Sequence, residues 1–155
     1  MRLCTPVLIA ACLVFSLPTI AGQLQQAPVS AAAPSCWASV KSTIEGYLGR
    51  PYVWGGTGLK SFDCSGFVWR VLYENGFMMK RTTARKLYFS LPKPAADATW
   101  TPGNIVFFND LKHCGIVNNS DSFYHAQSSK GTNLSPFSPY WRAQIVGVRC
   151  PFQNK

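Results

Sequence analysis

The sequence predicts an α+β fold in which helices come first and an antiparallel sheet follows. Apolar residues recur at helical spacing in the first half of the chain. A Pro-rich stretch over residues 91–103 interrupts this pattern. After it, short β-type runs alternate with turn residues up to the end of the chain. We therefore expect N-terminal helices packed on a sheet of about five strands.

Two helices are predicted before the Pro-rich stretch. The first has Ser35 as its N-cap and ends at Gly49. Its apolar residues fall at helical spacing: Trp37, Val40, Ile44 and Leu48. The second has Asp63 as its N-cap and ends at the Asn-Gly pair of residues 75 and 76. A short third helix is expected from Thr82.

The strands are predicted from composition and from the turns between them. The runs are NIVFF, HCGIV, SFYHA, GTNLS and QIVGVR, and NNSD and SSKG are typical turn sequences between them. Consecutive strands joined by such short turns pair in antiparallel fashion.

The first 22 residues are expected to be a secretory signal peptide, cleaved near Ala21 or Gly22. Arg2 precedes the apolar stretch LIAACLVFSL, small residues follow it, and the stretch is too short for a stable membrane helix. Cys12 also suggests a lipid anchor, but the apolar run continues past it, which favours cleavage. We expect an exported protein, periplasmic or secreted.

The remainder is expected to be a flexible leader over residues 23–34 and one domain over residues 35–155. The 155-residue chain has 15 basic and 6 acidic residues and a formal charge of +9. In an exported protein this charge favours anionic polymers such as those of the cell wall. Because the basic residues are scattered outside a cluster at 80–86, we expect no nucleic-acid partner. We expect a monomer without a membrane span.

Six cysteines are present, two of them in the expected signal peptide. The other four are Cys36, Cys64, Cys114 and Cys150. An exported protein can form disulfides, and the ends of a domain often lie close together. A disulfide between Cys36 and Cys150 is therefore expected.

Cys64 is the candidate nucleophile. Following the N-cap Asp63, it lies in the first turn of a helix, where unpaired N–H groups favour a thiolate and can form an oxyanion hole. The two histidines, His113 and His125, fall in predicted neighbouring strands, which would place them side by side. A cysteine, a histidine and a second polar group that orients this histidine form the triad of a cysteine nucleophile.

A zinc site is the main alternative for these residues. The possible ligands are Cys64, His113, Cys114 and His125. However, His113 and Cys114 are adjacent on a strand and point to opposite faces, and the chain has no C-x-x-C pair. We expect neither metal nor cofactor, and we interpret Cys114 as a small buried hydrophobic residue.

The motifs YVWGGTGLKSFDCSGFV, PGNIVFF and HCGIV…FYHA resemble those of the NlpC/p-sixty family of cell-wall cysteine peptidases. The resemblance spans roughly residues 37 to 149. It implies a papain-like fold and hydrolysis of peptidoglycan stem peptides, usually between D-γ-glutamate and a diamino acid such as meso-diaminopimelate. It also implies that Cys64 is the nucleophile, that His113 is the general base and that His125 orients His113.

The resemblance further implies a substrate cleft lined by Tyr52, Asp63 and Ser65. Asp63 would receive the free amine of an L-Ala terminus, although helix capping explains this residue equally well. The chain departs from the family pattern at Asn104, which replaces an aspartate, and at Cys114, which replaces a valine. The family's Arg-Ser-x-x-x-Gln appears here as RTTARK, so the fine specificity stays open.

Two other functions stay open. One is an amidohydrolase or acyltransferase on a related papain-like fold, although such relatives tend to place the histidine before the cysteine. The other is a catalytically inactive wall-binding module, which the intact set of one cysteine and two histidines argues against.

Overall fold

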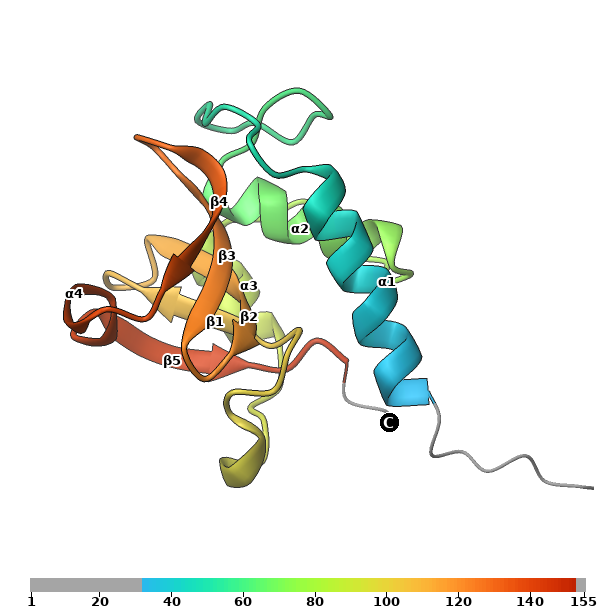
Figure 1. Ribbon diagram of the computed structural model, residues 1–155, viewed down its shortest axis with the longest axis vertical. Helices are drawn as coiled ribbons and strands as arrows, with labels where there is room; N and C mark the ends of the chain where they lie inside the picture. The colour runs from blue at the N-terminus through green and yellow to red at the C-terminus, as the bar shows by residue number, and fades with distance from the viewer. Residues whose placement is uncertain (1–31, 153–155) are drawn as a thin grey trace, which may run out of the picture.

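The computed structural model describes residues 32–152, with side chains from residue 37 onward (Figure 1). The expected signal peptide and most of the expected leader lie outside the described residues. The helices of the first half are α1 (Ala32–Gly46), α2 (Cys64–Glu74) and α3 (Ala84–Ser90), followed by the short 3₁₀ helix η2 (Ala96–Ala98). The second half contains β1 (Ile105–Phe108), β2 (His113–Asn119), β3 (Ser122–Gln127), β4 (Gly131–Pro136), α4 (Pro139–Arg142) and β5 (Ile145–Arg149).

The five strands form one antiparallel sheet in the order β4-β3-β2-β1-β5. The last strand returns across the sheet to pair with β1. Figure 1 shows α1 and α2 on one side of the sheet and α4 on the side of the molecule away from α1. The predicted α+β class is confirmed, with helices first and a five-stranded sheet after them.

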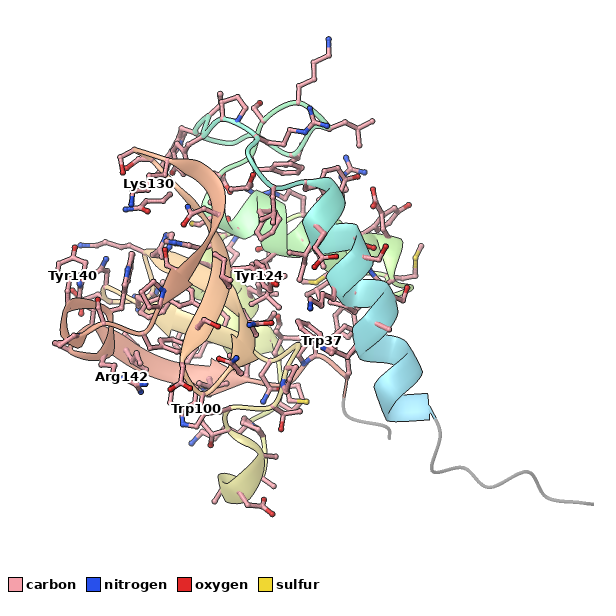
Figure 2. The ribbon with its side chains drawn as sticks, viewed as in Figure 1. Trp37, Trp100, Tyr124, Lys130, Tyr140 and Arg142 are labelled. Carbon is pink, nitrogen blue, oxygen red and sulfur yellow. The ribbon has the colours of Figure 1, made fainter. Side chains whose placement is uncertain are left out.

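Residues that alternate along the strands form two cores, one on each face of the sheet. The core on the helical side joins α1, α2 and α3 to the sheet, and its members include Ile44, Phe67, Leu87, Phe107, Cys114 and Ile116. The core on the other face consists of Val106, Phe108, Val117, Phe123, Phe137 and Val148. Figure 2 shows Trp37 pointing from α1 toward the sheet, where it packs against the first core.

The helix boundaries agree with the predictions at α2 and differ elsewhere. α2 has Asp63 as its N-cap and Asn75 as its C-cap, as expected. α1 begins at Ala32, earlier than expected, because alanines are strong helix formers and extend it. α3 begins after Thr83, whose side chain caps it. α4 was not predicted: a four-residue helix is too short to show a periodic pattern, although Ser-Pro is a typical helix start.

The two ends of the described chain come together. A Cβ at Gly103 would lie 3.4 Å from the ring of Phe152 and 3.6 Å from the ring of Trp37, so these two aromatic residues flank the same glycine. Cys150 has a free, half-buried thiol, and the side chain of Cys36 lies outside the described residues. The disulfide between Cys36 and Cys150 therefore stays a prediction.

Candidate active site

Cys64 is the first residue of α2 and lies at the junction of this helix with the sheet. The side chain of Asp63 caps the helix by accepting a hydrogen bond of 2.6 Å from the N–H of Gly66. Cys64 is only 7% exposed, and its sulfur lies 3.8 Å from the carbonyl oxygen of Lys112, just before β2. The cap and the adjacent strand therefore fix the position of the thiol.

Two glycines let the elements of the site approach one another. At Gly66, a Cβ would collide with the carbonyl oxygen of Gly56 in the preceding loop. At Gly115, a Cβ would lie 2.7 Å from the ring of Phe123 and 3.2 Å from the Cβ of His125. Gly66 lets the loop cover the start of α2, and Gly115 lets β3 bring His125 close to β2.

A chain of hydrogen bonds runs from His113 across three strands. His113 lies close enough to Cys64 to lower the pKa of its thiol. His113 Nε2 lies 2.8 Å from Nδ1 of His125, and Nε2 of His125 lies 2.9 Å from Oγ of Ser135. The Ser135 hydroxyl then donates to the amide oxygen of Asn133 at 2.9 Å. The structure therefore brings together all three residues of the predicted triad.

The surroundings of Cys64 favour its thiolate. A hydrogen bond from the Cys114 thiol is the largest cause that lowers the pKa of Cys64, from its ordinary value near 9 to about 5. Burial opposes this shift, and His113 adds to it through a hydrogen bond and through its charge. The shift favours the anionic form of the Cys64 sulfur at neutral pH, which is the reactive form of a cysteine.

Cys114 has a larger part in the site than the sequence indicated. It is fully buried and belongs to the core on the helical side, as its predicted orientation away from His113 requires. Its thiol nevertheless contacts the sulfur of Cys64. Burial, followed by the neighbouring Cys64, raises the pKa of Cys114 well above its ordinary value. Cys114 therefore stays protonated and donates to the thiolate, which a hydrophobic residue cannot do.

His125 stays neutral in this environment. Burial is the main cause that lowers the pKa of His125, to about 3, and the charge of His113 adds to it, while the nearby Asn133 side chain opposes the shift. A neutral imidazole can orient His113 without competing with it for the proton taken from Cys64.

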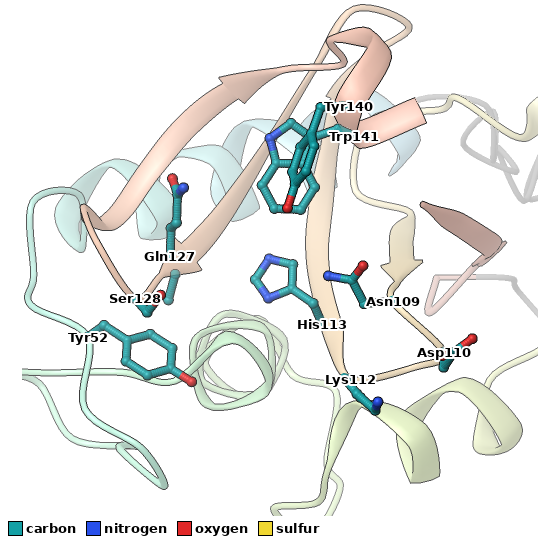
Figure 3. Close-up of a pocket in the computed structure, with 10 residues that line it drawn as sticks. Tyr52, Asn109, Asp110, Lys112, His113, Gln127, Ser128, Tyr140 and Trp141 are labelled. Carbon is teal, nitrogen blue, oxygen red and sulfur yellow. The ribbon is translucent and has the colours of Figure 1, made fainter. Parts of the chain in front are cut away.

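A cavity of about 540 Å³ opens in front of His113 (Figure 3). Figure 3 shows the His113 ring near its middle, with Tyr140 and Trp141 of α4 on one side and Tyr52 on another. The cavity is lined by Tyr52, Asn109, Asp110, Lys112, His113, Ala126, Gln127, Ser128, Tyr140 and Trp141. Its volume is typical of a site for a small molecule or a short peptide segment.

Of the three residues expected to line the substrate cleft, only Tyr52 lines this cavity. Burial is the main cause that raises the pKa of Tyr52, and the charge of Cys64 adds to it, so its hydroxyl stays a hydrogen-bond donor.

Asp63 and Ser65 belong instead to a network with Arg81. The Asp63 carboxylate accepts hydrogen bonds from Gly55 N–H, Gly66 N–H and Ser65 Oγ, and both its oxygens lie 2.7 Å from Nη2 of Arg81. Arg81 also donates to the Ser65 hydroxyl at 3.1 Å. This geometry favours the capping role of Asp63, and its contact with substrate stays a prediction.

Sequence reasoning missed four residues of the site. Ser135 and Asn133 extend the hydrogen-bond chain, Arg81 holds Asp63, and Trp141 stacks against His113 with ring centroids 5.5 Å apart. The motif RTTARK already contained Arg81. No local signal marks the other three, because their positions depend on the register of β4 and on the short helix α4.

A thiolate at a helix N-terminus, paired with a histidine on an antiparallel sheet, defines the site of a cysteine peptidase. The model of the NlpC/P60 family matches residues 49–150, and the chain belongs to this family. The family and the enzyme class expected from the motifs are thus confirmed.

Relatives and solved structures agree with this assignment. The probable peptidoglycan endopeptidase LytE of Bacillus subtilis is 36% identical over 113 residues, which cover 70% of this chain and 32% of LytE. The gamma-DL-glutamyl hydrolase of the same organism is 30% identical over 118 residues, covering 71% of this chain and 28% of the hydrolase. A crystal structure of an NLP/P60 family protein from Staphylococcus aureus, described as similar to lipoprotein, has a TM-score of 0.68 and 26% identity, covering 77% of this chain and 42% of that one. The chain spans about a third of the length of these two Bacillus relatives.

Two further observations concern metals and membranes. Within residues 32–152, no group of three or more metal-ligating side chains is arranged to hold an ion. Over the same part of the chain, no helix has both the length and the apolar character needed to cross a bilayer.

Proposed function

We propose that this chain hydrolyses peptidoglycan stem peptides at the bond between D-γ-glutamate and a diamino acid such as meso-diaminopimelate. Cys64 is the nucleophile, His113 the general base and His125 the residue that orients His113. The placement of Cys64 beside His113, together with the hydrogen-bond chain from His113 to Asn133, carries the proposal. The names of the two Bacillus relatives, a peptidoglycan endopeptidase and a gamma-DL-glutamyl hydrolase, support the substrate class.

The reaction begins from the ion pair in which Cys64 has transferred its proton to His113. Nε2 of His113 is bonded to His125, which leaves Nδ1 to take this proton. The thiolate attacks the carbonyl carbon of the γ-glutamyl amide, and the carbonyl oxygen becomes an oxyanion. The first N–H groups of a helix have no intrahelical acceptor, and that of Gly66 already donates to Asp63, so those of Cys64 and Ser65 can donate to this oxyanion.

Two stages complete the reaction: departure of the amine and hydrolysis of the thioester. His113 gives its proton to the nitrogen of the diamino acid, the C–N bond breaks and a thioester with Cys64 remains. His113 next takes a proton from water, whose oxygen attacks the thioester. The γ-glutamyl product leaves with a new carboxylate, and Cys64 returns to the thiolate.

The cavity carries both charges that a zwitterionic stem peptide needs. Asp110 is the only carboxylate among its lining residues, and Lys112 lies beside it on the loop between β1 and β2. Because the Asp63 carboxylate is already occupied by five contacts, we assign the substrate ammonium to Asp110 and a substrate carboxylate to Lys112. The chain acts outside the cytoplasm in this proposal, as the expected signal peptide implies.

Mass spectrometry of purified sacculi, digested with wild type or with Cys64→Ala, tests the proposal. Wild type is expected to release fragments with a new amino terminus on the diamino acid, and Cys64→Ala none. Cys150→Ala, which removes a half-buried cysteine outside the site, is the matched control and should cleave like wild type. Cleavage at another bond would refute the proposed bond. Equal cleavage by Cys64→Ala would refute the nucleophile, and no cleavage by wild type would favour a binding module.

A further inference from the structure

Trp141 contacts both imidazoles of the site. Its ring is stacked against that of His113, with centroids 5.5 Å apart and planes inclined by 26°. The same indole meets the ring of His125 edge to face, at 5.1 Å and 90°. Trp141 is half-buried and lines the cavity beside His113 (Figure 3). Because it also contacts His125, it covers one side of the pair of imidazoles.

The position of Trp141 is fixed from several directions. It belongs to α4, which starts with Ser138 as its N-cap and Pro139 in its first turn. Its ring packs at 5.1 Å against Phe108 and at 5.3 Å against Phe123, both fully buried. An aromatic ring held in this way can restrain the orientation of a neighbouring ring.

The stacked geometry also has an electrostatic consequence. The face of an indole attracts a cation that lies within about 6 Å of its centroid, and the attraction grows when water is excluded. His113 becomes a cation when it takes the proton of Cys64, and its centroid lies inside this distance. Trp141 therefore favours the state in which Cys64 is a thiolate and His113 an imidazolium.

We propose that Trp141 is a positioning residue for the general base: it holds the His113 ring in the orientation in which Nε2 meets Nδ1 of His125, shields this hydrogen bond from solvent and stabilises the imidazolium. This inference rests on the general-base role of His113 in the proposed function. Trp141 takes no part in bond making or breaking; it acts through His113.

The test compares Trp141→Leu and Trp141→Phe with Trp100→Leu. Trp100 packs against the same core, with its ring 5.0 Å from Phe137, and has no ring contact with either histidine. Its replacement therefore removes a comparable amount of packing and leaves the imidazoles untouched. Figure 2 shows Trp100 away from Tyr140, the neighbour of Trp141.

The readout is the rate of Cys64 alkylation by iodoacetamide as a function of pH, which requires no peptidoglycan. The midpoint is compared rather than the plateau, because a smaller side chain also widens access. Trp141→Leu should raise the midpoint by roughly half a unit to one unit, and Trp141→Phe, which keeps a ring face, by less. Trp100→Leu should lower the melting temperature and leave the midpoint unchanged. The titratable groups around His113 stay the same in every variant: Cys64, His125, Asp110, Lys112, Tyr52 and Tyr140.

The outcomes separate this inference from the proposed function. If wild-type Cys64 shows no reactive thiolate below neutral pH, the proposed function fails. If wild type shows it and the Trp141→Leu and Trp141→Phe profiles coincide with the wild-type profile, Trp141 only supports the fold and the inference is wrong. A graded rise in the order Trp, Phe, Leu supports it, and Trp141→Phe keeps the comparison possible should Trp141→Leu not fold.

Discussion

Nε2 of His113 lies 2.8 Å from Nδ1 of His125, and the hydrogen bonds that follow it along the chain indicate which of these nitrogens carries the proton. The Ser135 hydroxyl donates to Asn133, so it accepts from Nε2 of His125. Nδ1 of His125 is then unprotonated and accepts from Nε2 of His113. The remaining nitrogen of His113, Nδ1, is left to take the proton of Cys64 in the proposed reaction. One arrangement of protons thus satisfies every hydrogen bond of the chain.

Cys64 is expected to be the most rapidly alkylated thiol of the native protein. Because its pKa is lowered to about 5, the thiolate dominates above that pH, and the alkylation rate should rise with a midpoint near pH 5. Cys114 is fully buried and stays protonated, so it should not react. Peptide mapping after treatment with iodoacetamide at about pH 6 measures this. Labelling of Cys114 first, or of no cysteine, would contradict the assignment of the nucleophile.

The two histidines should differ in their sensitivity to substitution. His113→Ala removes the base and should reduce turnover by roughly 10²–10⁴-fold or more. His125→Asn or His125→Gln should retain part of the activity, because an orienting group needs to supply only one hydrogen bond to Nε2 of His113. The steady-state rates at which these variants hydrolyse a stem peptide measure the difference. Equal, complete loss in both, together with release of a bound metal, would instead support the zinc alternative.

Cys114→Val should make Cys64 less acidic. Valine is similar in size and apolar, and it is the residue that the family pattern places here, so the core should tolerate it. The variant loses the thiol that donates to Cys64, the largest cause of its low pKa. The alkylation midpoint should rise by roughly one to two units, the value of a hydrogen bond to a charged group. Cys150→Val is the control. Equal alkylation midpoints in wild type, Cys114→Val and Cys150→Val would show that Cys114 is only a packing residue.

Much of the fold could be predicted because its signals are local. The strands after residue 103 are short apolar runs bounded by turn residues, and α2 has a strong cap and stop. That Cys64, His113 and His125 lie together was also predictable, since Cys64 follows a cap and the two histidines fall in neighbouring strands. α4 was not predictable, because four residues show no period.

The rest of the site depends on contacts between distant segments. Strand alternation correctly placed Cys114 on the face opposite to His113. It could not show that α2 begins beside the start of β2, where residues from both faces reach one sulfur. In the same way, Ser135 meets His125 only through the register between β3 and β4.

Arg81→Ala should destabilise the protein through Asp63. The two side chains are 25% and 10% exposed and form a paired contact at 2.7 Å. The loss should lower the free energy of unfolding by roughly 1.5–3 kcal/mol, the range for a hydrogen bond to a charged group. Lys86→Ala, an exposed cation of α3, is the matched control and should change it by less than about 0.5 kcal/mol. Urea denaturation measures the free energy of unfolding of both variants. Equal losses in Arg81→Ala and Lys86→Ala would mean that the contact between Arg81 and Asp63 contributes no more than a surface charge.

The last prediction concerns Cys36 and Cys150. Phe152 and Trp37 flank the same glycine, so Cys150 and the start of α1 lie near one another, as a disulfide would require. Such a bond would close a loop of about 115 residues, which the chain-entropy description values at about 4–5 kcal/mol before any strain. Peptide mapping without reductant of protein secreted by an oxidising host should therefore yield a Cys36–Cys150 cross-linked peptide. Reduction should lower the melting temperature and leave activity at moderate temperature unchanged, because Cys150 does not line the cavity. A peptide joining Cys64 to Cys114 would contradict this pairing, since it would lock the nucleophile in a disulfide.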